Sequence, residues 1–180
     1  MHNNFLVDRT GKMSKSSGDT LTLQRLIDRG FHPLSYRVMC LQAHYRSELE
    51  FSWDNLFAAQ VRLKRWAHAV EGLRARAEAP GGADVSGYHA QLDAALSDDL
   101  NTPRALPVLD ALLADKRLSP ADRLEALAMF DAALGLNLTS LTRATLRVRP
   151  IEATVDVDTI EARLAERRAA RAAKDFARSD

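Results

Sequence analysis

The recurrence of leucine and valine at helical spacing is the feature that most limits the fold of this chain. Between residues 52 and 134, apolar side chains return at steps of three, four and seven residues, with Ser, Thr, Pro and Gly at the ends of these runs. This spacing places the apolar side chains on one face of each helix, so the helices must pack against each other. The positions expected in the core are Leu56, Leu63, Trp66, Val70, Leu73, Leu106, Leu109, Leu113, Leu124, Leu127 and Leu134.

The composition agrees with a mainly helical globular protein. Hydrophobic residues make up 46% and charged residues 27%, and Ala, Leu and Arg, which are abundant here, favour helices. The net charge of +1 excludes a strong overall basic field, so any RNA contact would need local patches. The single Cys40 excludes an internal disulfide. With no long apolar run and no signal peptide, we expect a cytoplasmic protein without a membrane partner.

The first 52 residues predict a small mixed segment. Residues 5–7 are typical of a strand or hairpin arm and are followed by a turn and then a loop over 12–19. Thr22 is expected to cap a helix that reaches Asp28 and is ended by Gly30, and His32-Pro33 should begin the next helix. From that helix we expect four side chains to face the core: Leu34, Val38, Leu41 and Tyr45.

The rest of the chain predicts further helices. Ser52 should cap a long helix to about Ala79, and Thr102 and Ser119 should each cap a helix that begins with proline. Asp158 with Glu161 predicts a capping box for an Arg-rich helix that continues to the end of the sequence. We therefore predict a mainly α protein: a small mixed segment (1–52), an antiparallel helical bundle (53–136), a linker or weak strands (137–157) and a truncated C-terminal helix (158–180).

The loop Lys12-Met13-Ser14-Lys15-Ser16 has the composition of a phosphate-binding loop. A lysine beside serine and glycine can place its ammonium on a phosphate, which helps most where charge develops on a departing pyrophosphate. The same composition also occurs in ordinary solvated linkers. The sequence has no Walker, GxGxxG or HExxH motif, and its five histidines are scattered, so we expect no metal site in this chain.

Several segments, in order along the chain, together resemble one family. They are His2-Asn3-x-Phe5-Leu6, Lys12-Met13-Ser14-Lys15-Ser16, Ala43-His44-Tyr45-Arg46-Ser47, Asp99-Leu100-Asn101-Thr102-Pro103 and Arg168-x-x-Arg171-x-x-Lys174-Asp175-Phe176-Ala177. This set resembles the cysteinyl-tRNA synthetases, which are class I aminoacyl-tRNA synthetases. The resemblance covers the part of the family from its signature loop onward.

The resemblance implies a role for the loop. Lys15 would be the main ATP contact and Lys12 a supporting one, with Met13, Ser14 and Ser16 shaping the loop. Where family members have Leu-Gly-Asn after the signature, this chain has Ser17-Gly18-Asp19, which adds a negative charge. The implied tRNA contacts are Arg46, Arg62, Arg65, Arg168, Arg171 and Lys174.

The resemblance also implies partners. They are ATP with Mg, cysteine, tRNA(Cys) and an N-terminal catalytic half, but not DNA; the zinc ligands of the family would lie in that half. Two alternatives stay open at this point. One is a stand-alone, non-catalytic module that binds tRNA or protein. The other is part of the related ligase that joins cysteine to an amino sugar in thiol biosynthesis.

Overall fold

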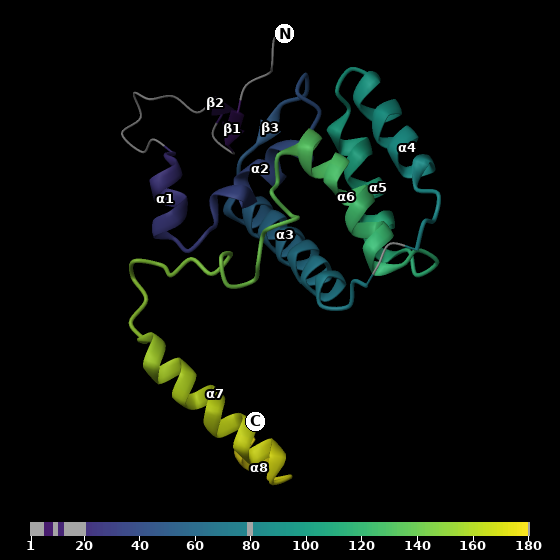
Figure 1. Cartoon of the computed structure of the whole chain (residues 1–180). Coiled ribbons are helices and arrows are strands. Elements are labelled where there is room, and N and C mark those ends of the chain that lie inside the picture. The colour runs from purple at the N-terminus through teal and green to yellow at the C-terminus, as the bar shows by residue number, and fades with distance from the viewer. Residues whose placement is uncertain (1–5, 9–10, 13–20, 79–80, 180) are drawn as a thin grey trace.

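The fold is a helical bundle with a small sheet at one side and a helical arm at the other (Figure 1). It is seen in a computed structural model that describes residues 6–8, 11–12, 21–78 and 81–179. The prediction of a mainly helical protein with a small mixed segment at its start is confirmed. The domain boundaries stay a prediction.

The sheet joins the start of the chain to the entrance of the bundle. β1 (Leu6–Asp8) pairs antiparallel with β2 (Gly11–Lys12), as expected for a hairpin, and parallel with β3 (Leu49–Glu50), giving the order β2-β1-β3. Parallel strands need a crossover connection, and α1 and α2 provide it here. The hairpin that carries Lys12 is therefore held beside the segment leading into the bundle.

Helices α1 (Leu23–Asp28) and α2 (Pro33–Leu41) begin and end where local signals predict. The Thr22 hydroxyl accepts a hydrogen bond from the backbone of α1, and His32 caps α2 through its ring. Gly30 ends α1 in the left-handed region, with φ of 86°. One core prediction from this part is wrong, since Tyr45 lies beyond the end of α2 in a polar surface cluster.

Four helices form the bundle: α3 (Trp53–Arg74), α4 (Ser86–Ser97), α5 (Thr102–Ala114) and α6 (Pro120–Leu134). α3 is the central element and packs against α2, α5 and α6. The predicted stripe of α3 is buried throughout, and so are the leucines predicted for α5. α3 ends at Arg74 rather than near Ala79, and the Arg74 side chain donates hydrogen bonds to the carbonyls of Thr139 and Leu141.

The caps of α5 and α6 differ in how well the sequence predicts them. Asn101, not Thr102, caps α5; the Thr102 hydroxyl instead donates to the carbonyl of Leu41. At α6 the predicted cap, Ser119, is confirmed. It forms a capping box, in which Ser119 and Asp122 each accept a hydrogen bond from the other's backbone N–H. Asp122 is buried there, only 2% exposed.

The segment after α6 packs on the bundle without forming a regular element. The sequence predicts an extended linker or weak strands, but no strand forms within the described residues 136–157. Asp131 accepts hydrogen bonds from the backbone of Leu138 and Thr139, and Glu71 pairs with Arg143 at 2.6 Å. Four leucines of this segment are buried in the core: Leu136, Leu138, Leu141 and Leu146.

Helices α7 (Val157–Ala172) and α8 (Phe176–Ser179) form an arm that extends away from the bundle (Figure 1, yellow-green). The cap of α7 is Asp156, which accepts from Thr159 at 2.7 Å, two residues before the predicted Asp158. The prediction of one continuous helix is wrong, because α7 ends at Ala172 and Lys174 takes a left-handed conformation with φ of 59°. The chain turns there and α8 contacts α7.

Candidate functional site

The predicted phosphate loop lies between two described elements. Lys12 is the last residue of β2, where its backbone pairs with Val7. The other predicted loop residues, Met13, Ser14, Lys15 and Ser16, lie outside the described residues. The described chain resumes at residue 21, just before α1.

Two motif segments that are distant in sequence meet at one surface cluster, formed by His44, Tyr45, Arg46 and Asp99. The Tyr45 hydroxyl donates to Asp99 Oδ1 at 2.6 Å, and Arg46 Nε lies 3.1 Å from Asp99 Oδ2. His44 Nδ1 accepts from the Arg46 backbone, so its Nε2 carries the proton and donates to the Asp99 carbonyl at 3.0 Å. We call this arrangement the Asp99 cluster.

The turn that carries Asp99 has an unusual backbone. Asp99 and Leu100 both have φ of 55°, which costs energy for residues other than glycine and persists only where surrounding contacts hold it. Those contacts are the Asp99 cluster itself and the hydrogen bond from Thr102 to Leu41. The end of α2 and the α4–α5 turn are therefore fixed to each other.

Two predicted tRNA contacts, Arg62 and Arg65, already bind a carboxylate inside the bundle. Arg62 Nη2 donates to Asp110 Oδ2 at 2.6 Å, and Arg65 Nη2 donates to Asp110 Oδ1 at 3.2 Å. Trp66 Nε1 also donates to Asp110 Oδ1, at 2.6 Å, and the Arg62 guanidinium lies over the Trp66 ring. This arrangement joins α3 to α5 and neutralises one positive charge on this part of α3.

The other predicted contacts lie on the arm. Arg168, Arg171 and Lys174 are exposed, and the side chains of Arg168 and Arg171 make no hydrogen bond or ion pair within the described part of the chain. Nearer the start of α7, Arg163 pairs with Glu166 at 3.2 Å. The structure therefore leaves the guanidinium groups of Arg168 and Arg171 available to a partner.

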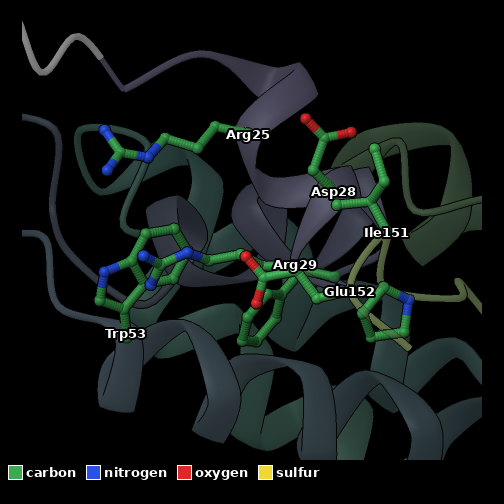
Figure 2. Close-up of a pocket in the computed structure, with 8 residues that line it drawn as sticks. Arg25, Asp28, Arg29, Trp53, Ile151 and Glu152 are labelled. Atoms are coloured by element: carbon green, nitrogen blue, oxygen red, sulfur yellow. The ribbon is translucent and has the colours of Figure 1, made fainter. Parts of the chain in front are cut away.

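Sequence reasoning missed a pocket between α1, the start of α3 and residues 150–152 (Figure 2). Arg29 lies over the Trp53 ring, 4.1 Å from its centroid, and Arg25 precedes it by one helical turn. The i, i+4 spacing of these arginines was visible in the sequence, but the proximity of Trp53 was not. The pocket is lined by Arg25, Asp28, Arg29, Phe31, Trp53, Pro150, Ile151 and Glu152.

Cys40 has the environment of a structural thiol. It lies half-buried on α2, and burial raises the pKa of its thiol above the usual value. The protonated form is a poor nucleophile, so Cys40 has the character of a structural rather than a reactive thiol.

The described residues offer no cluster of three His, Cys, Asp or Glu side chains that could hold a metal ion. The zinc implied by the family resemblance therefore finds no fitting ligand set in this part of the chain. Among the helices of the same residues, none is both long enough and apolar enough to cross a membrane.

Comparison with known proteins finds relatives that match the whole chain. No protein-family model matches it. Cysteine–tRNA ligases from Novosphingobium aromaticivorans and Zymomonas mobilis are 58% and 44% identical to it. Cysteine–tRNA ligase 1 from Burkholderia lata is 44% identical. Each match covers all of this chain but only 37%, 42% and 36%, respectively, of the relative.

The chain is therefore homologous to part of a class I aminoacyl-tRNA synthetase. More specifically, it matches the C-terminal part of the cysteine–tRNA ligases, and it spans about two fifths or less of their length. The predicted resemblance is confirmed.

Proposed function

We propose that this chain forms part of a cysteine–tRNA ligase, an enzyme that activates cysteine with ATP and transfers it to tRNA(Cys) in the cytoplasm. The observation that carries the proposal is the match over the whole chain to relatives named cysteine–tRNA ligase, at up to 58% identity. The Asp99 cluster supports it, because two of the motif segments behind the resemblance contact each other there.

In this proposal the segment from Lys12 to Ser16 closes over ATP. Attack of the cysteine carboxylate on the α-phosphorus forms the adenylate and releases pyrophosphate, which takes up negative charge as it departs. The ammonium of Lys15, supported by that of Lys12, stabilises this charge in the transition state. Magnesium, bound with ATP, would neutralise further phosphate charge.

The helical arm is the proposed docking site for tRNA. Arg168 and Arg171 support this role, since they are exposed and have no intramolecular partner among the described residues. Arg46, exposed at the Asp99 cluster, is a second proposed contact. Arg62 and Arg65 are weaker candidates, because Asp110 already binds both.

The test is Lys15→Ala in the complete ligase, followed by ATP–pyrophosphate exchange. Loss of a charge that acts on the transition state should lower the exchange rate on the order of 10²-fold, with a smaller change in cysteine binding. Lys64→Ala is the matched control, since Lys64 is an exposed lysine on α3. It should leave the rate unchanged.

An unchanged rate in the Lys15→Ala ligase would remove Lys15 from its proposed role. We also expect these 180 residues alone to catalyse no exchange, because they hold no HIGH-type motif. Exchange by the isolated chain would contradict that expectation.

A further inference from the structure

The pocket beside Trp53 is built from three separate parts of the chain. Trp53 packs edge-on against Phe51 and tilted against Phe31, with ring centroids 5.2 and 5.8 Å away. These contacts fix the plane of the indole ring before any ligand arrives. The Arg29 guanidinium lies over that plane, so the pocket contains a cation stacked on the indole ring of Trp53.

The far wall of the pocket is also fixed. The Ile151 N–H donates to the Asp28 carbonyl at 2.8 Å. Pro150 packs so close to Gly30 that a Cβ added there would lie 2.7 Å from the proline ring. The volume is about 570 Å³, which falls in the range of small-molecule sites. The pocket is therefore preformed and large enough for one ligand unit.

Charge is unevenly distributed around this pocket. Arg25 and Arg29 extend to the same side in Figure 2, and Glu152 and Asp28 supply carboxylates elsewhere on its wall. No ion pair within the described part of the chain includes Arg29. A ligand that fits must carry an anion for the arginines, a flat ring for the stack and N–H groups for a carboxylate.

We propose that this pocket binds one nucleotide whose base carries an amino group. The phosphate would lie on Arg25 and Arg29, and the base would stack on the Arg29 guanidinium, which planar bases favour. Its amino group would donate to Glu152, as carboxylates accept from cytosine N4. The nucleotide is either a free mononucleotide or a unit of RNA; its assignment to RNA rests on the proposed function.

The test follows tryptophan fluorescence of the whole chain during titration. Of its two tryptophans, Trp66 is 1% exposed and Trp53 lines the pocket, so a ligand there should quench Trp53. One arm uses AMP, CMP and UMP, and a second uses a short single-stranded oligoadenylate RNA. We expect quenching by AMP and CMP, or by the RNA alone if the nucleotide belongs to a strand.

Arg29→Ala should weaken binding at least about tenfold, because the stack and a phosphate contact are lost together. Arg76→Ala is the matched control, since Arg76 lies past the other end of α3 and should leave binding unchanged. Glu152→Gln should weaken the binding of AMP more than that of UMP. Equal affinity of the native chain and Arg29→Ala, or absence of quenching in both arms, would overturn the proposal.

The outcome is separable from that of the proposed function. The Arg29→Ala change acts on Trp53 quenching, whereas the ligase proposal is tested by exchange in the Lys15→Ala enzyme. Suppose that Trp53 quenching depends on Arg29 but the exchange rate is unchanged in Lys15→Ala. That result would support the nucleotide-binding pocket and contradict the proposed role of Lys15. The opposite pair of results would remove the pocket alone.

Discussion

The arginines of the bundle and those of the arm differ in their partners. In the bundle, Arg62 and Arg65 bind Asp110, and Arg74 binds two carbonyls beyond the end of its helix. On the arm, Arg168 and Arg171 are exposed and bind no described residue. Both regions are rich in arginine, but in the described residues the side chains of Arg62, Arg65 and Arg74 have partners within the protein, whereas those of Arg168 and Arg171 do not.

A basic helix in a sequence therefore predicts an RNA-binding surface only when the side chains packed against it are known. In the sequence, α3 and α7 are both charged helices, and both supply residues that are predicted to contact tRNA. Asp110, on a different helix, changes the role of α3, because a charge-assisted contact inside the protein competes with contact to phosphate.

The first prediction compares one leucine from each region. Leu109→Ala removes a side chain that is fully buried in the bundle, and it should lower the free energy of unfolding by about 2–5 kcal/mol. Leu164→Ala on α7 removes an exposed side chain and should change it by less than about 0.5 kcal/mol. Urea unfolding followed by circular dichroism measures both. Similar losses for the two variants would show that the arm packs on the bundle in solution.

The second prediction concerns Asp110. Asp110→Asn weakens three contacts, from Arg62, Arg65 and Trp66, and should cost about 1–3 kcal/mol of unfolding free energy. The matched change on the arm is Glu166→Gln, which breaks only an exposed pair with Arg163 and should cost less than about 0.5 kcal/mol. If Asp110→Asn leaves the free energy of unfolding unchanged, the stability of the bundle does not depend on this carboxylate.

The third prediction is a pH dependence. Hydrogen bonds from Ser119 hold the pKa of the Asp122 carboxyl below its usual value. The ionised form is therefore favoured in the folded protein. Its contribution is present above the unfolded pKa of about 4 and is lost as the pH falls through the lower folded pKa.

Asp122→Asn should accordingly lower the melting temperature at pH 7 and make less difference at pH 3. Hydrogen bonds from Thr159 lower the pKa of Asp156 in the same way at the start of α7. Asp156→Ala removes this cap and should reduce helix content without moving the main unfolding transition. If Asp122→Asn lowers the melting temperature equally at pH 7 and pH 3, the ionised carboxylate of Asp122 is not the source of its stabilising effect.

The last prediction has the smallest effect on stability. Replacing both Arg168 and Arg171 by Ala should leave the melting temperature unchanged but weaken binding of tRNA. The slope of log affinity against log salt should fall by about two, one for each lost phosphate contact. Arg163→Ala is the control on the same helix and should change the slope less. An unchanged slope in the double variant would remove these residues from the docking site.

The fold was predictable where the decisive signals are local. Thr22, Ser52 and Ser119 all cap the helices that the sequence assigns to them, because a cap needs only a few consecutive residues. The errors arose where distant residues decide. At the start of α5, for example, the Thr102 hydroxyl donates to the distant carbonyl of Leu41 instead of capping the helix.

The candidate sites were less predictable than the fold. The sequence singled out His44 to Arg46 and Asp99 only as parts of a resemblance, and it could not show that they meet, since pairing across 55 residues leaves no periodic signal. The pocket beside Trp53 was missed for the same reason. Asp156 as the cap of α7 was within reach, because Asp156 and Thr159 have the required spacing.

The hydrogen bond between Ile151 and Asp28 also bears on the order of folding. It closes a loop of more than a hundred residues, and such non-local contacts form slowly because the entropy of closing the loop opposes them. α1 packs against α2, and its hydrogen bond to Ile151 requires the segment after α6 to be in place. The part of the chain next to Lys12 and Lys15 should therefore be among the last to acquire its native structure.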